Sequence, residues 1–220
     1  MAPKPASGRE NRTKRPSADA TRERILAAAL DLFSELSYEG ATTREIAARA
    51  GVTQPLLNYH FRSKEELWRA AVDGLFETLE RRLTARTEGL RGVDEVTVLR
   101  LLVREFIEYS ASHPQHHRII TQECKTDGPR MDYLVDRHIR SRYEETVAMF
   151  GRLVEAGHLP DIPLAHIYYI VVGAGPTMFV LAPECRRLAG IDPQDPEVIE
   201  MHVDAVTALL FGKWNSEGHE

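Results

Sequence analysis

Residues 53 to 60 bring together side chains that can read the edges of DNA bases. Gln54 and Asn58 carry amides of the kind that pair with adenine, while Pro55 and Leu56 offer apolar surface to thymine methyl groups. The alternative for Gln54 or Asn58 is that its side chain is exposed to solvent and contacts no DNA. On one short segment, this mixture is chemically suited to base recognition in a major groove.

A second set of side chains suits the phosphate backbone better than the bases. Thr53, Tyr59 and His60 can donate hydrogen bonds to phosphate oxygens. Lys64 and Arg44 each fall in the first turn of an expected helix, where free backbone amides also favour anions. These five residues are therefore candidate phosphate contacts.

Two short helices joined by a tight turn would hold these side chains outward. Thr42 and Glu45 have the spacing of a capping box, which predicts a short helix that ends at Gly51. Thr53 can cap the next helix with its hydroxyl, and Pro55 is tolerated in a first turn because that amide has no intrahelical partner. The pattern predicts a helix-turn-helix whose second helix projects into the major groove.

Longer helices are expected on either side of this unit. Apolar residues recur at three- and four-residue steps from Ile25 to Leu36, which predicts a first helix that stops near Ser37 to Gly40. Ser63 and Glu66 form a second capping box and predict a long fourth helix that leads away from the first three.

The rest of the chain is also expected to be helical. No strand-type alternation competes with the helical periodicity, so the fold class is all-α with about nine helices. The later helices are expected at roughly 93–112, 114–126, 129–156, 163–181 and 196–213. The domain organisation expected is a disordered basic arm at 1–16, a three-helix DNA-binding domain at 17–69, and a helical ligand-binding and dimerisation domain at 70–220.

Charge is distributed unevenly along the chain, whose net charge is −5. Residues 1–69 carry 12 Lys and Arg against 9 Asp and Glu, and the remainder carries 16 against 24. A basic head on an acidic body is the polarity expected if one end alone faces phosphate, although chance asymmetry explains it as well. The basic arm lies along the DNA or is a solvated tail.

No apolar run approaches the roughly 20 residues that cross a bilayer, and the start is polar, so a cytoplasmic protein without a membrane partner is expected. Cys124 and Cys185 are too few for a disulfide framework and lack zinc-site spacing.

The pattern from Arg22 to Leu67 resembles that of a known family. Its matching positions are Ile25-Leu26-Ala27-Ala28-Ala29, Leu32-Phe33, Tyr38, Thr42, Ile46-Ala47, Ala50-Gly51-Val52-Thr53, Leu57, Tyr59, Phe61, Ser63-Lys64 and Leu67. This run of about 46 residues resembles the N-terminal domain of the tetracycline-repressor (TetR) family.

The resemblance implies an Ω-shaped homodimer of nine-helix bacterial subunits, held together by the last two helices, with a small-molecule effector in the C-terminal domain. It implies DNA contacts at Thr42, Thr43, Arg44, Thr53, Gln54, Pro55, Leu56, Asn58, Tyr59, His60 and Lys64. The sequence departs from the family at Ser37, where glycine is usual, so a slightly strained or differently shaped turn is expected there.

Aromatic residues of the central helices are candidates to line the effector cavity. The four chosen are Phe106, Tyr109, Tyr143 and Phe179, and the expected inducer is apolar or amphipathic. The last helix, from Ile199 to Phe211, is apolar on more than one face, which indicates a subunit interface.

Two other classes compete with a ligand-responsive repressor of an inverted-repeat operator. His113, His116 and His117 suggest an all-α metalloenzyme, but no carboxylate stands at ligand spacing. Neither a catalytic signature nor a cofactor motif is present, so a non-enzyme without cofactor or metal is expected. A DNA-architectural protein without an effector is the other alternative.

Overall fold

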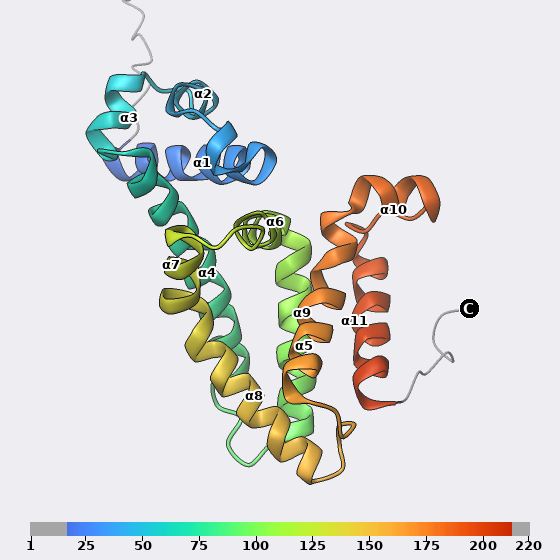
Figure 1. The fold of residues 1–220 in the computed structure, drawn as a ribbon. Helices are drawn as coiled ribbons and strands as arrows, with labels where there is room; N and C mark the ends of the chain where they lie inside the picture. The colour runs from blue at the N-terminus through green and yellow to red at the C-terminus, as the bar shows by residue number, and fades with distance from the viewer. Residues whose placement is uncertain (1–16, 213–220) are drawn as a thin grey trace, which may run out of the picture.

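The computed structural model describes residues 17–212, and these fold into eleven α-helices and one π-helical segment, with no strand among them (Figure 1). The expected all-α class is confirmed. The elements are α1 Ala18–Gly40, α2 Thr43–Arg49, α3 Gln54–His60, α4 Lys64–Thr87, α5 Glu95–Ser112, α6 Pro114–Glu123, α7 Pro129–Leu134, η1 Val135–Ile139, α8 Arg140–Glu155, α9 Leu164–Val180, α10 Ala182–Leu188 and α11 Pro196–Phe211. The basic arm expected at 1–16 lies outside the described residues.

Side-chain caps fix several helix starts where the sequence predicts them. Thr42 accepts from the amide of Glu45, whose carboxylate accepts from the amide of Thr42, so the capping box of α2 is complete. Ser63 caps α4 by accepting from the amide of Glu66 at 3.0 Å, but the Glu66 carboxylate accepts from the amide of Arg62 instead. Thr53 occupies the N-cap of α3 without a side-chain bond, so its predicted capping role is wrong.

The first three helices pack around a dry core, and α1 lies beneath α2 and α3 in Figure 1. Ile25 and Phe33 of α1, Ile46 of α2 and Leu57 of α3 are all buried there. The guanidinium of Arg24 on α1 donates to the carbonyl oxygen of Gly51 at 3.0 Å. The turn between α2 and α3 is therefore held against α1, and α3 is left on the outside.

Ser37 interrupts α1 with a backbone conformation that serine rarely adopts. Its φ of 65° and ψ of 173° lie in a region that is essentially reserved for glycine. Ser37 is the only non-glycine residue with positive φ in the described chain, and it stands where the sequence predicts a strained or differently shaped turn. The conformation turns the chain toward α2.

Helix α4 joins these first helices to the rest of the molecule, where α5, α9 and α11 stand side by side and α8 runs past α4 (Figure 1). One buried cluster extends from α1–α4 into Ile119 of α6 and Leu134 of α7. A second joins α5, α8, α9 and α11. The first core thus continues past residue 69, where the sequence places a domain boundary.

Two features depart from the helix pattern expected beyond α6. The stretch expected as one helix at 129–156 contains the π-helical η1, which adds a wider turn between α7 and α8. The short α10 follows α9 through a bend of 73°. In the described part of the chain no single helix is long and apolar enough to cross a membrane, although α9 and α10 taken together meet that length and composition.

Candidate DNA-binding surface and ligand cavity

The outer face of α3 presents the predicted base-reading side chains to solvent. Gln54, Pro55, Leu56 and Asn58 are all exposed, while Leu57 between them is buried in the core. This alternation follows from helix geometry, because Leu57 alone lies on the side that faces α1. Nothing within residues 17–212 covers this face.

Tyr59 is the most exposed large side chain of this face, at 81% of its full area. Its ring meets that of His60 edge to face, with 5.4 Å between centroids. An aromatic side chain without apolar cover on a monomer is a recurrent sign of a partner surface. It carries a hydroxyl that can reach a phosphate oxygen.

A shallow groove runs between α2, α3 and the start of α4. Its lining includes Thr43, Gln54, Asn58 and Lys64, which the sequence nominates as DNA contacts. Gln54 donates to the hydroxyl of Thr43 at 3.4 Å, and the ammonium of Lys64 lies 4.5 Å from the centroid of the Tyr38 ring. The geometry therefore places candidate base contacts and a cation beside one another.

One candidate of this groove, Thr42, has another role in the free protein. The hydroxyl of Thr42 donates to the Glu45 carboxylate at 2.7 Å, so it is already engaged in the cap of α2. Arg44 is exposed in the first turn of α2, with no described side chain paired to it. Arg62 is exposed, lines the same groove and was missed by the sequence reasoning, although a basic residue next to Ser63 and Lys64 is visible in the sequence.

A cavity of about 920 Å³ lies in the body between α4, α5, α6, η1, α8 and α9. Most of its lining is apolar and comes from the middle of these helices. Representative apolar residues are Leu79, Leu83, Val103, Phe106, Ile120, Ile139, Met149 and Val172. Its volume falls within the range of pockets that hold small organic ligands, about 300–1,000 Å³.

Of the four aromatic residues nominated for ligand contact, only Phe106 lines the cavity. Tyr109 is buried beside α4, where its hydroxyl donates to the carbonyl of Leu75 at 2.8 Å. Phe179 packs in the second core against the ring of His202. Tyr143 meets Tyr168 edge to face, and Tyr168 rather than Tyr143 borders the cavity. These three nominations are corrected by the packing.

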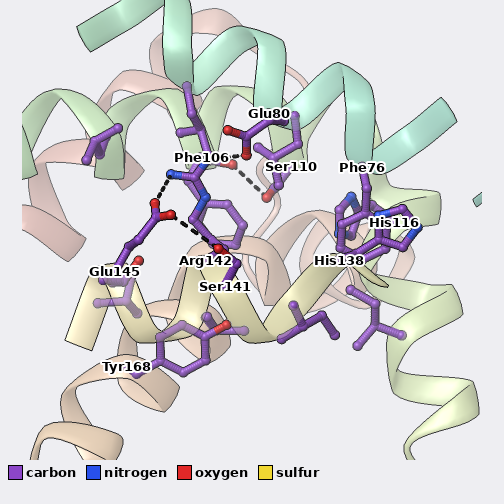
Figure 2. A pocket seen from close by; sticks show the side chains of 18 of the residues that line it. Phe76, Glu80, Phe106, Ser110, His116, His138, Ser141, Arg142, Glu145 and Tyr168 are labelled. Atoms are coloured by element: carbon purple, nitrogen blue, oxygen red, sulfur yellow. Dashed lines mark hydrogen bonds and ion pairs between the residues drawn. The ribbon is translucent and has the colours of Figure 1, made fainter. Parts of the chain in front are cut away.

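Charged side chains of the cavity gather at its rim. Arg142 on α8 pairs with Glu80 on α4 and with Glu145 at 3.7 Å, and Figure 2 shows this group on one side of the pocket. Glu80 and Glu145 are exposed. The ion pair therefore spans α4 and α8 where the cavity meets solvent.

An aromatic stack closes the other end of the cavity (Figure 2). The ring of Phe76 lies 4.4 Å from His116 and 4.4 Å from His138, and it is nearly parallel to His138. His138, in η1, contacts the Asp73 carboxylate on α4 at 2.7 Å, and the Tyr133 hydroxyl donates to the same oxygen at 2.7 Å. The wall of the cavity is thus bonded directly to α4, the helix that follows α3 in the chain.

The three histidines that suggest a metal site serve different purposes. His113 stacks on Tyr109 with centroids 4.5 Å apart, and His116 is buried with its Nδ1 2.9 Å from the Tyr109 hydroxyl. Burial lowers the pKa of His117. Across residues 17–212 no three His, Cys, Asp or Glu side chains are grouped so that they could hold a metal ion.

The last helices expose more apolar surface than a monomer needs. On α9 and α11 the exposed apolar side chains are Tyr169, Ile170, Met201 and Leu209, the last at 74% of its full area. Since α9 packs against α11, these residues belong to neighbouring helices. Tyr169 also borders the cavity. Exposed large apolar side chains such as those of Ile170, Met201 and Leu209 are typical of a protein interface.

Comparison with known proteins matches this architecture. Residues 25–71 match the family model described as "Bacterial regulatory proteins, tetR family". This range covers most of α1, then α2 and α3, and the first part of α4.

Curated relatives and solved structures extend the likeness. The HTH-type transcriptional regulator RutR of Escherichia coli O157:H7 is 25% identical over 195 residues, which cover 89% of this chain and 91% of RutR. The class A tetracycline repressor from transposon 1721 of Escherichia coli is 47% identical over 55 residues, or 25% of this chain and 24% of that repressor. AibR, solved in complex with isovaleryl coenzyme A and operator DNA, has a TM-score of 0.70 and 19% identity over 87% of this chain and 98% of its own. The chain is a member of the TetR family of bacterial transcriptional regulators.

Proposed function

We propose that this protein is a homodimeric repressor that binds an inverted-repeat operator and leaves it when a small apolar or amphipathic molecule fills the cavity. It acts on chromosomal DNA in the cytoplasm and is not an enzyme. Residues 17–69 bind DNA, and residues 70–220 bind the effector and dimerise.

The outward face of α3 is the observation that carries this proposal. Exposed amides at Gln54 and Asn58 can pair with adenine edges, and exposed Leu56 can contact a thymine methyl. Tyr59, Lys64 and Arg62 stand beside them, where phosphates flank a helix in the major groove.

The tie between the cavity wall and α4 supports control by a ligand. Phe76 and Asp73 lie on α4, and both contact His138 of η1 at the edge of the cavity. A molecule that displaces this stack shifts α4, and with it the separation of the two α3 helices of the dimer. The ligand acts because it binds one of two positions of α4 more tightly than the other. AibR, which was solved with both a coenzyme A thioester and operator DNA, is a precedent for two such ligands on one fold.

The test is selection of binding sites from random duplex DNA with the full-length protein. We expect enriched inverted repeats with half-site centres separated by about 34–36 Å, or a multiple of this distance, because the two-fold axis of a dimer must match that of its site. Recovery of no common sequence would refute specific regulation and favour an architectural role.

Two variants separate phosphate contacts from base contacts on the selected duplex. Lys64→Gln should weaken binding to every sequence and lower the salt dependence by about one phosphate contact for each subunit. Gln54→Ala should instead relax the preference at particular base pairs by about 1–3 kcal/mol. Fluorescence anisotropy over a salt series measures both. Equal effects of the two substitutions on all sequences would contradict the assignment.

A further inference from the structure

The polar side chains of the cavity are sorted by depth. Glu77, Glu80, Arg81 and Glu145 line it but are exposed to solvent, so they belong to its rim. Ser110 and His116 also line it and are 4% and 8% exposed. Arg142 and His138 line it as well and are half-buried, but Arg142 pairs with Glu80 and Glu145, and His138 pairs with Asp73. Ser110 and His116 are therefore buried polar groups of the lining without an ionic partner.

Ser110 turns its only hydroxyl proton away from the cavity. Its Oγ donates to the carbonyl oxygen of Phe106 one helical turn earlier, at 2.7 Å. Toward any other partner the Oγ can only accept a hydrogen bond.

Tyr109 likewise leaves His116 able only to accept a hydrogen bond from a ligand. The Tyr109 hydroxyl has one proton, which it donates to the carbonyl of Leu75 at 2.8 Å. Its contact with Nδ1 of His116, at 2.9 Å, must then be donated by the imidazole ring. Nε2 of His116 is left as a bare acceptor, and no hydrogen bond within the described chain uses it.

His116 also stays neutral. Burial first, and then the neighbouring charges of His117, His113 and His138, lower its pKa to about 3. At physiological pH the ring therefore offers a lone pair, not a positive charge.

We propose that the ligand of this cavity is an uncharged, largely apolar molecule that carries a hydroxyl or N–H donor at its buried end. This inference rests on the proposed ligand-binding role of the cavity. A carboxylate placed against His116 would face the lone pair of Nε2, and a purely apolar group there would leave this acceptor unsatisfied.

Three probes with a common ten-carbon body test this chemistry by calorimetric titration of the full-length protein. Decan-1-ol carries a donor, 1-methoxydecane only an acceptor, and decanoate a negative charge. We expect decan-1-ol to bind about tenfold more tightly than the ether, and more tightly than decanoate. Equal affinities of alcohol and ether, tighter binding of decanoate, or no binding of any probe would overturn the proposal. None of these results depends on DNA binding, which tests the proposed function separately.

Two variants test the residues themselves. His116→Asn keeps an N–H near the position of Nδ1 and removes the acceptor at Nε2, so the tenfold preference for the alcohol over the ether should vanish. Loss of affinity for all probes alike would show a structural role only and would overturn the assignment.

Tyr109→Phe provides a second variant that changes no atom of the proposed acceptor. Without the Tyr109 hydroxyl, the proton of His116 is free to move to Nε2, and the alcohol should lose its advantage over the ether. Nitrogen NMR of the imidazole should show Nε2 unprotonated at pH 7 in the unaltered protein. A protonated Nε2 there would contradict the inference without any ligand.

Discussion

Ser37 holds a strained backbone because the chain must turn sharply between α1 and α2. Its conformation, with φ of 65° and ψ of 173°, costs a residue with a Cβ of the order of 1–3 kcal/mol. Glycine adopts it freely, at the expense of greater freedom in the unfolded chain.

Ser37→Gly should therefore raise the free energy of unfolding by about 1 kcal/mol. Urea unfolding at fixed protein concentration measures the change, because the proposed dimerisation would make stability depend on concentration. Ser37→Ala is the matched control and should give no comparable gain, since alanine also carries a Cβ. If alanine stabilised as much as glycine, the side chain rather than the backbone would be responsible.

At the scale of single residues, the sequence predicts chemistry better than orientation. It correctly predicts that Leu57 is buried and that its neighbours on α3 are exposed, because only one face of so short a helix can pack on the core. On α5 it cannot separate Phe106 from Tyr109, as both are aromatic. Ser110 shares the cavity with Phe106, and Tyr109 lies about 100° around the helix from Ser110, toward α4.

Among the elements, η1 is joined to α4 through one carboxylate. Asp73 accepts from the Tyr133 hydroxyl and contacts His138, both at 2.7 Å. Removing a hydrogen bond to a charged group costs about 1.5–3 kcal/mol.

Asp73→Ala should therefore open η1 locally while leaving the rest of the fold intact. We expect amides of Val135–Ile139 to exchange with deuterium at least about tenfold faster. Asp136→Ala is the control, because Asp136 pairs only with Arg140 beyond it on the same stretch of helix. Unchanged exchange in Asp73→Ala would show that packing alone holds η1 against α4.

A second junction joins α4 to α5 through a buried carboxylate. Glu105 is 4% exposed and receives hydrogen bonds from Arg82 and Arg86. Burial alone would raise its pKa, but the two arginines outweigh burial and hold the pKa of Glu105 below its ordinary value of 4.5. The stabilisation is therefore complete above that ordinary value and is lost as the pH falls through the lower pKa of the folded state.

Glu105→Gln should destabilise the protein by about 2 kcal/mol at neutral pH, and the difference from the unaltered protein should shrink below about pH 4. Chemical unfolding from pH 7 to pH 3 measures it. Glu184→Gln, at an exposed site on α10, is the control and should change little. A difference that persists undiminished at pH 3 would mean that shape, not charge, makes Glu105 necessary.

Helix boundaries were predictable wherever a polar cap or a proline marks them. The starts of α2, α4 and α11 follow Thr42, Ser63 and Asp195, each with a side-chain bond to a free amide. The π-helical turn of η1 was not predictable, because one wider turn leaves the composition unchanged. Helix α10 was missed because it follows α9 with only Leu181 between them.

At the scale of the whole molecule, the proposed recognition of an inverted repeat requires two copies of α3 in one fixed arrangement. A single seven-residue helix presents few base contacts, and a two-fold site doubles them only when both subunits are held rigidly. In Figure 1, α11, which carries the exposed Met201 and Leu209, lies on the far side of α5 and α9 from α4. A partner docked there leaves the cavity rim of each subunit accessible.

Leu209→Glu should therefore convert the proposed dimer to monomers and abolish tight operator binding, because it places a charge on the apolar surface at which we propose that the subunits meet. We expect a dimer dissociation constant raised by at least about 100-fold, measured by analytical ultracentrifugation. Val93→Glu makes the same chemical change at an exposed apolar site before α5 and should leave the dimer intact. Because Leu209 is distant in sequence from α3, loss of operator binding in the monomer would follow from assembly rather than from a damaged DNA contact. A Leu209→Glu protein that stays dimeric and binds the operator normally would place the interface elsewhere.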